Sequence, residues 1–459
     1  MTKEMKKLML LVFGLFSLFA TAQTQVREES YSLSLEEAVA LGMENNYSSQ
    51  ISEKDVEKAL KQKWEIISQG LPQIAANVDY QNYIEQPVTL IPGEIAGGEP
   101  GTFFPARFGT KQNMAATATW SQLIFDGSYI VGVQSARTLL QISKNAKTKT
   151  DLEVRKAVIN AYGNVLMAEE SVEIIRKNLR NIEKNLNDTR QIVANGLAEE
   201  EDAEQLKITQ LSLQNNLSRS TRMLEIAYQM LNMAMGIPVE TPVTLTENLD
   251  ALAAEFIDLQ LLEKEVPVEE NIDYRIAENS AESAAIFVRL EKAKALPTLT
   301  GFLNIGATGN SDKFTFLSDD QKYYSQSILG INLSVPIFSS GMRSARTAQK
   351  EIEYEQALLE LEETRNRISL EKESARSDYR FSLENFQTTQ ESLELARRIE
   401  RKNQVKFYEG LASSFELNEA QRQLYNAQQN LLQAMLDVIN AKVELENILA
   451  TTTYEEIND

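Results

Sequence analysis

A long stretch without helix breakers constrains the fold of this chain more than any other feature. No proline follows Pro336 and no glycine lies between Gly341 and Gly410, so 68 consecutive residues lack both. Apolar residues recur in this stretch at spacings of three and four, which predicts one continuous helix of about 100 Å. A globular domain does not need a helix of that length, so we expect a coiled coil or a helical repeat.

The segment after Gly410 carries a regular heptad. Alanine occupies every seventh position from Ala420 to Ala441, and Leu or Val fills the other apolar position from Leu417 to Leu445. A less strict version runs from Ala203 to Ala234. Because large side chains fit the space beside alanine on a neighbouring helix, this pattern favours long antiparallel helices that pack closely.

The chain also repeats itself once. Asn195-Gly196-Leu197-Ala198 corresponds to Glu409-Gly410-Leu411-Ala412, and Leu71-Pro72 corresponds to Leu296-Pro297 in the same order. A tandem duplication explains ordered matches of this kind, and each copy reads as helix, strand pair, long helix, turn and long helix. The predicted division is a signal peptide at 1–22, a first repeat at 23–240, a linker at 241–270, a second repeat at 271–450 and a tail at 451–459.

Four stretches between the helices alternate polar and apolar residues. They are Ile74–Tyr80, Met114–Trp120, Leu299–Ala307 and Leu329–Val335. A period of two predicts strands, and a tilted strand of about ten residues can cross a bilayer. We expect loops at 85–111 and 310–324 to join them as two hairpins. Four strands cannot close a barrel, so a spanning sheet needs several copies of the chain, while a soluble sheet packed on the helices is the alternative.

The first 22 residues predict export. Lys3, Lys6 and Lys7 precede an apolar run from Leu8 to Phe19, and Ala20-Thr21-Ala22 follows, which is typical of a cleaved secretory signal. The run has only twelve residues, whereas a membrane anchor needs about 20. We therefore expect cleavage after Ala22.

Composition excludes several classes of function. The chain has no Cys and no His, which rules out thiolate or imidazole zinc sites and Ser-His or Cys-His nucleophile pairs. The formal charge of −20 disfavours nucleic acid as a partner. Phosphate-binding glycine motifs are missing as well. We expect no cofactor and no metal, and catalysis by paired carboxylates is the one enzymatic chemistry left open.

Short motifs, in the same order in both repeats, resemble the TolC family of outer-membrane efflux proteins. They are Ser34–Val39, Leu71-Pro72, Leu296-Pro297, Val335–Phe338, Gly410-Leu411 and Leu424–Ala427. The fold expected is mainly α, with four strands in each chain. The resemblance implies a homotrimer with a shared 12-stranded barrel in the outer membrane and an α-helical barrel in the periplasm of a Gram-negative cell. It implies a channel, not an enzyme, that serves an adaptor protein and an inner-membrane transporter in efflux or type I secretion.

The resemblance also suggests site residues. Family members carry a pair of acids shortly after the second turn that lines the narrow periplasmic entrance, and Glu416 and Glu419 hold these places. Asp202 aligns with Glu416 in the first repeat and is the third candidate. Ser413 and Glu416 also match a capping box, so a purely structural role for Glu416 is the alternative.

This chain departs from the family pattern at two places. At the end of the second strand Gln122-Leu123 replaces the usual proline, so we expect Asp126-Gly127 to make the bend into the helix. Around the second turn Phe407 and Ala412 stand where relatives can have a tyrosine and a basic residue. That difference argues against a gate built from those particular links.

Two other classes of function remain compatible with the sequence. One is a secreted coiled-coil scaffold or adhesin with a soluble sheet, which would leave the membrane fraction with salt or carbonate. The other is an envelope hydrolase with paired carboxylates, although no pair stands out in the sequence.

Overall fold

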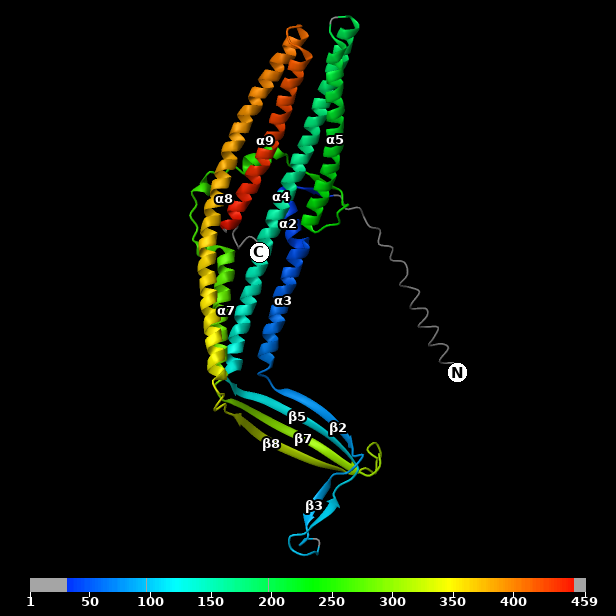
Figure 1. The fold of residues 1–459 in the computed structure, drawn as a ribbon, viewed down its shortest axis with the longest axis vertical. Helices are drawn as coiled ribbons and strands as arrows, with labels where there is room; N and C mark the ends of the chain where they lie inside the picture. The colour runs from blue at the N-terminus through cyan, green and yellow to red at the C-terminus, as the bar shows by residue number, and fades with distance from the viewer. Residues whose placement is uncertain (1–30, 96, 197, 450–459) are drawn as a thin grey trace, which may run out of the picture. The chain divides into compact units, whose positions relative to one another are not determined.

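The computed structural model describes residues 31–95, 97–196 and 198–449 (Figure 1). The predicted signal peptide, the predicted tail and Leu197 of the first turn lie outside the described residues. The described chain divides into two compact units. We call residues 31–47, 153–263 and 376–445 the helical unit, and residues 48–152, 264–375 and 446–449 the sheet unit.

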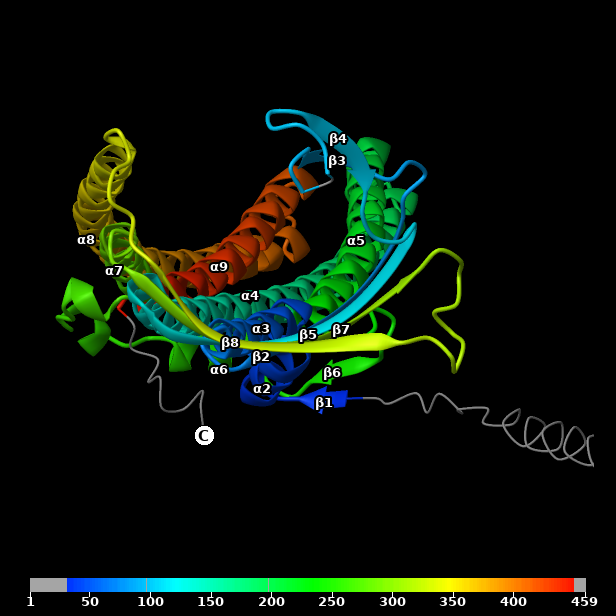
Figure 2. The same cartoon turned by 90° about the horizontal axis from the view of Figure 1, so that it is seen from below.

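A four-stranded sheet forms the centre of the sheet unit. Its strands are β2 (Gln73–Asn82), β5 (Gln112–Asp126), β7 (Thr298–Ser311) and β8 (Tyr323–Ser334). They lie side by side in the order β2-β5-β7-β8, and all neighbours are antiparallel (Figure 1). Figure 2 shows the same strands from below. The four predicted strands are confirmed. Three of them are longer than the ten residues expected, with 15, 14 and 12 residues in β5, β7 and β8.

The predicted bend at Asp126-Gly127 is confirmed. Oδ1 of Asp126 accepts hydrogen bonds from the backbone N–H groups of Ser128 and Tyr129, at 2.6 and 3.2 Å. The carboxylate thus caps the first turn of α4 (Gly127–Ala194). A Cβ on Gly127 would come within 2.5 Å of Cδ1 of Leu296, so a larger residue there would require the Leu296 side chain to move.

The prediction that residues 85–111 form only a loop is wrong. This segment contains a second, two-stranded sheet of β3 (Val88–Pro92) and β4 (Phe103–Arg107). Proline is rare inside strands because it has no N–H to donate to a neighbouring strand. Both β3 and β4 contain a proline, so their sequences did not predict strands. The second loop is shorter than predicted, since β7 continues to Ser311 and β8 begins at Tyr323.

Two long helix hairpins contribute most of the helical unit. The first joins α4 to α5 (Glu200–Met235), and the second joins α8 (Met342–Tyr408) to α9 (Ser414–Ile448). The predicted uninterrupted helix is α8, with 67 residues. Gly196 and Gly410 have φ of 72° and 73° at the two turns, a left-handed conformation that glycine adopts without strain. Figure 1 shows the helices of the two hairpins in the order α8, α9, α4, α5.

The remaining elements are short helices and strands together with three helices of intermediate length. In the helical unit they are β1 (Tyr31–Leu33), α2 (Leu35–Asn45), β6 (Val243–Leu245), α6 (Leu249–Glu255) and the 3-10 helix η1 (Gln260–Leu262). In the sheet unit they are α3 (Tyr47–Ser68), the 3-10 helix η2 (Val268–Glu270) and α7 (Ile272–Ala293). The predicted element order recurs in both halves, as β2, β5, α4, α5 and as β7, β8, α8, α9. The exact boundaries of the repeats and of the linker stay predictions.

The heptad positions form the core of each hairpin. Leu206 and Leu213 of α5 pack with Ile175, Ile182 and Leu186 of α4. In the second hairpin Ala427 of α9 packs with Leu393 and Ala396 of α8, and Leu424 and Leu431 pack against this cluster. The heptad positions of each hairpin, which we call its seam, therefore join the two helices of that hairpin. Among the helices that the structure describes, none combines the length and the apolar character needed to cross a membrane.

Candidate functional site

The register of the sheet separates an apolar face from a polar face. Ile74 pairs with Trp120, Trp120 with Leu303, and Leu303 with Leu329, so one row across all four strands is apolar. The adjacent row is Ala75, Thr119, Asn304 and Ile328, and it lies on the opposite face. Ile74 and Leu329 are each 78% exposed. An exposed apolar surface of this extent marks contact with a membrane or another protein.

Each face keeps its character over several residues of every strand. The apolar face carries Ile74, Ala76, Val78, Tyr80, Met114, Ala116, Ala118, Trp120, Leu303, Ile305, Ala307, Leu329, Ile331 and Leu333. The polar face carries Asn77, Asp79, Asn113, Thr117, Thr119, Asn304, Thr308, Asn310, Gln326 and Asn332. On the latter, Nδ2 of Asn113 donates to Oδ1 of Asn310 at 2.8 Å. This division is what a strand between lipid and water requires.

Glu416 caps the start of α9. The backbone N–H of Ser413 donates to its Oε2 at 2.9 Å, and its own N–H donates to Oγ of Ser413 at 3.3 Å. These reciprocal bonds form the capping box that the sequence predicted as the structural alternative. The carboxylate is exposed.

Glu419 and Asp202 each have a polar partner. Arg422 donates to both carboxylate oxygens of Glu419, at 2.9 and 2.7 Å from Nη2. Hydrogen bonds from Arg422 and Gln423 lower the pKa of Glu419. Asp202, near the start of α5, accepts a hydrogen bond from the hydroxyl of Ser414 at the start of α9. The structure thus brings Asp202 next to the turn that carries Glu416, and links the two hairpins there.

Tyr408 provides a second link between the hairpins that sequence reasoning missed. Its hydroxyl, on α8, donates to Oδ2 of Asp188 at 3.4 Å or to Oδ1 of Asn185 at 3.5 Å, both on α4. Burial and the nearby charge of Asp188 raise the pKa of Tyr408. Phe407, the residue that stands where relatives can have a tyrosine, directly precedes Tyr408. The signal that could have found the link is a tyrosine two residues before the turn glycine.

Further hydrogen bonds between the hairpins join neutral side chains, and Lys156 of α4 forms an ion pair with Glu444 of α9. Oγ of Ser171 and Nδ2 of Asn178, on α4, donate to Gln429 and Gln428 of α9, both at 3.2 Å. Oγ1 of Thr209 on α5 donates to Oδ1 of Asn418 at 3.3 Å or to the backbone carbonyl of Gln205 at 3.1 Å. The corresponding signal in the sequence is the excess of amide side chains beside the seam of α9.

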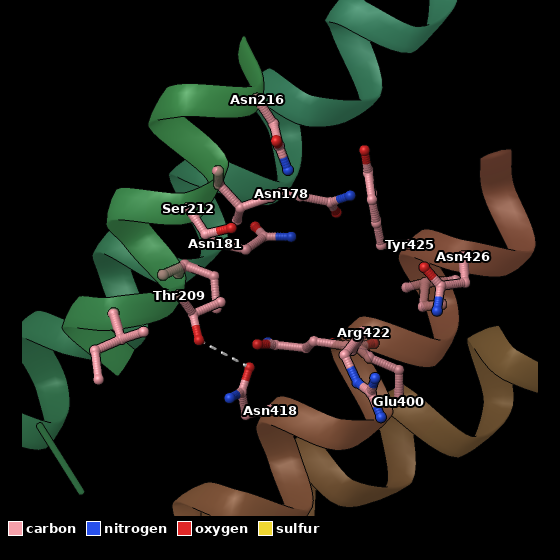
Figure 3. A pocket seen from close by; sticks show the side chains of 15 residues that line it. Asn178, Asn181, Thr209, Ser212, Asn216, Glu400, Asn418, Arg422, Tyr425 and Asn426 are labelled. Atoms are coloured by element: carbon pink, nitrogen blue, oxygen red, sulfur yellow. Dashed lines mark hydrogen bonds between the residues drawn. The ribbon is translucent and has the colours of Figure 1, made fainter. Parts of the chain in front are cut away.

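A pocket of about 380 Å³ opens between the hairpins, close to these contacts. Figure 3 shows side chains from both hairpins that point into it. Its labelled lining residues are Asn178, Asn181, Thr209, Ser212 and Asn216 from α4 and α5, and Glu400, Asn418, Arg422, Tyr425 and Asn426 from α8 and α9. The other lining residues are Gln421 and the aliphatic Ile182, Ile208, Leu213 and Leu424. Amide and aliphatic groups therefore share the lining with one carboxylate, one guanidinium and one phenol.

The sheet with one lipid-compatible face and the paired long hairpins define a class of protein, the outer-membrane channels with a helical extension. Comparisons with known proteins agree. The family model described as outer membrane efflux protein matches residues 269–451. The outer membrane protein TolC of Vibrio cholerae is 22% identical over 75% of this chain and 78% of its own length. The alkaline protease secretion protein AprF of Pseudomonas aeruginosa is 22% identical over 96% of this chain and 88% of its own length.

The fold comparison points the same way. The solved structure of CusC has a TM-score of 0.71 at 17% identity and covers 90% of this chain and 91% of that one. Residues 269–451 thus match the outer membrane efflux protein family, and the chain is similar over most of its length to TolC, AprF and CusC. It is a protein of the outer membrane with its helical part in the periplasm.

Proposed function

We propose that three copies of this chain form one continuous duct from the periplasm to the exterior. The observation that carries this proposal is the amphipathic sheet. Among the described strands, β2 and β8 each pair on one side only. A free edge in lipid leaves backbone N–H and C=O groups unsatisfied, so β8 of one copy would pair with β2 of the next. Three copies of four strands give a 12-stranded barrel, which lies within the range of outer-membrane barrels.

The relatives suggest the system that the duct serves. Two relatives are named for secretion of proteases, one solved structure is named an outer-membrane channel, and the matching family is described as outer membrane efflux protein. This chain would accordingly be the exit duct of a tripartite efflux or type I secretion system. It would receive its substrate from an inner-membrane transporter through a periplasmic adaptor protein. It would act by conducting, not by catalysing a reaction.

Neighbouring positions on β8 allow a matched test of the barrel. Ile331 lies on the apolar face and Asn332 on the polar face. Ile331→Lys would place a charge in lipid and cost about 2 to 4 kcal/mol near the middle of the bilayer, whereas Asn332→Lys would face water. We expect the first variant to be depleted from the outer membrane and the second to insert and run as a trimer on unheated gels. Recovery of the unaltered protein as a soluble periplasmic monomer would instead favour the scaffold or adhesin.

We also propose that Glu416, Glu419 and Asp202 line the periplasmic aperture. Threefold symmetry would arrange them as acidic rings, and rings of carboxylates favour cations in channels. Capping by Glu416 and pairing of Glu419 with Arg422 do not remove these charges from the turn end. Single-channel currents in planar bilayers test the role. The double variant Glu416→Gln and Glu419→Gln should lose cation preference and block by trivalent ions, and unchanged selectivity in a folded variant would leave both residues as helix-end stabilisers.

A further inference from the structure

The pocket between the hairpins contains two hydrogen-bond acceptors that are incompletely satisfied. Oε1 of Gln421 is buried and has no hydrogen-bond partner among the described residues. The half-buried carboxylate of Glu400 lines the same pocket. Buried acceptors without donors are costly, so the pocket is complementary to a ligand that supplies donors.

The charges around the pocket favour a cationic ligand. The structure pairs Arg422 with Glu419, which satisfies the one basic side chain of the lining. The carboxylate of Glu400 accepts a hydrogen bond from Gln421 and is attracted by the positive charge of Arg401. In the part of the chain that the structure describes, Glu400 forms no ion pair within contact distance. Burial raises the pKa of Glu400 above its ordinary value because the carboxylate is poorly compensated.

We propose that this pocket is a binding site for an organic cation with a primary ammonium group. Such a group supplies three donors and one positive charge, which match Glu400 and Oε1 of Gln421. Tyr425 adds an aromatic ring, a favourable neighbour for a cation. The amides of both hairpins can bind hydroxyl or amine groups on the rest of the ligand, and the volume suits a small molecule.

The side chains that line the pocket argue against other classes of ligand. An anion would meet the unpaired charge of Glu400. A neutral sugar would find amide partners, but it would leave the carboxylate without a counter-charge. A ligand that fills the pocket would contact residues of both hairpins, since Glu400 and Gln421 belong to the second and Asn178, Asn181 and Asn216 to the first.

Calorimetric titration of the purified full-length protein in detergent tests the site, with spermidine as the probe and N-acetylglucosamine as the neutral comparison. Glu400→Gln keeps the shape and removes the charge, and we expect it to weaken spermidine binding about tenfold or more. Glu391→Gln makes the same change at an exposed position on the same helix and should bind like the unaltered protein. Thermal unfolding of each variant establishes that it is folded.

Three results would overturn the proposal. One is spermidine affinity that is unchanged in folded Glu400→Gln. Another is affinity that depends on Glu416 and Glu419 instead, which would assign the cation to the turn acids. The third is tighter binding of the neutral sugar than of spermidine. Since binding is measured on the isolated protein, each result is independent of whether the protein conducts in a membrane.

Discussion

The interface inside each hairpin and the interface between the two hairpins are built from different chemistry. Inside the hairpins, Leu206 and Leu417 are fully buried in the apolar seams. Between them, from Ser171 to the turns, the polar contacts are single hydrogen bonds at 3.2 to 3.5 Å together with the bond from Ser414 to Asp202, and Tyr425 packs against the apolar cluster of the first hairpin. Farther from the turns, Lys156 of α4 forms an ion pair with Glu444 of α9. Close to this second interface, Nδ2 of Asn185 and Oγ1 of Thr189 are buried without a hydrogen-bond partner among the described residues.

The difference indicates which interface yields first. A fully buried leucine contributes roughly 1.5 to 3 kcal/mol, while a neutral hydrogen bond contributes a net 0.5 to 1.5 kcal/mol or so. An unsatisfied buried polar group costs about 1 to 3 kcal/mol. In the part nearer the turns, each hairpin should therefore behave as one piece, and the two hairpins should separate there at a lower cost than either hairpin melts.

The largest expected effect comes from removing a seam leucine. Leu206→Ala leaves a cavity between α4 and α5, and large-to-small changes of this kind cost about 2 to 5 kcal/mol. Leu211→Ala removes the same atoms from a side chain that is 51% exposed on the same helix, and should cost much less. Thermal unfolding followed by circular dichroism measures both. Equal losses in the two variants would mean that the seam does not hold the hairpin together.

A smaller loss is expected from overfilling the seam. Ala427 is 7% exposed and packs against Leu393 and Ala396, so Ala427→Leu should cost about 1 to 3 kcal/mol. Asn430→Leu introduces a similar side chain at an exposed position of α9 and serves as the control. Unfolding midpoints and the amount of trimer on unheated gels report the effect. A stable trimer in the Ala427 variant would show that the alanine positions tolerate bulk.

The polar interface should respond with opposite signs at two threonines. Thr189→Val replaces an unpartnered buried hydroxyl with a methyl group and should stabilise the folded chain by about 1 kcal/mol. Thr209→Val removes the donor to Asn418 and should destabilise it by roughly 0.5 to 1.5 kcal/mol. Unfolding in denaturant compares the two. Loss of stability in the Thr189 variant would reveal a partner for its hydroxyl and weaken the contrast between the interfaces.

The contrast also explains what could be predicted from the sequence. The seams and the four strands follow from the local spacing of apolar residues, and the turns follow from the glycines at 196 and 410. Each of these signals depends only on residues that are close together in the sequence. The contacts between hairpins depend on which faces meet, as with Tyr408 and Asp188, 220 residues apart. No local pattern specifies that meeting. The sequence consequently predicted the hairpins and the acids at their ends, but not the pocket or the Tyr408 link.

The smallest expected effect separates charge from packing in the pocket. Burial raises the pKa of Glu400, so the folded chain holds this proton more tightly than the unfolded chain does. Stability is then lost as the pH rises from the ordinary glutamate range through the folded pKa, and it is unaffected below both values. Glu400→Gln removes the charge, so it should melt slightly above the unaltered protein at neutral pH and together with it at acidic pH. Glu391→Gln should match the unaltered protein throughout the range. If Glu400→Gln melted lower than the unaltered protein at neutral pH, the carboxylate would be stabilising the contact between the two hairpins. The interface between the hairpins would then be more stable than its hydrogen bonds indicate.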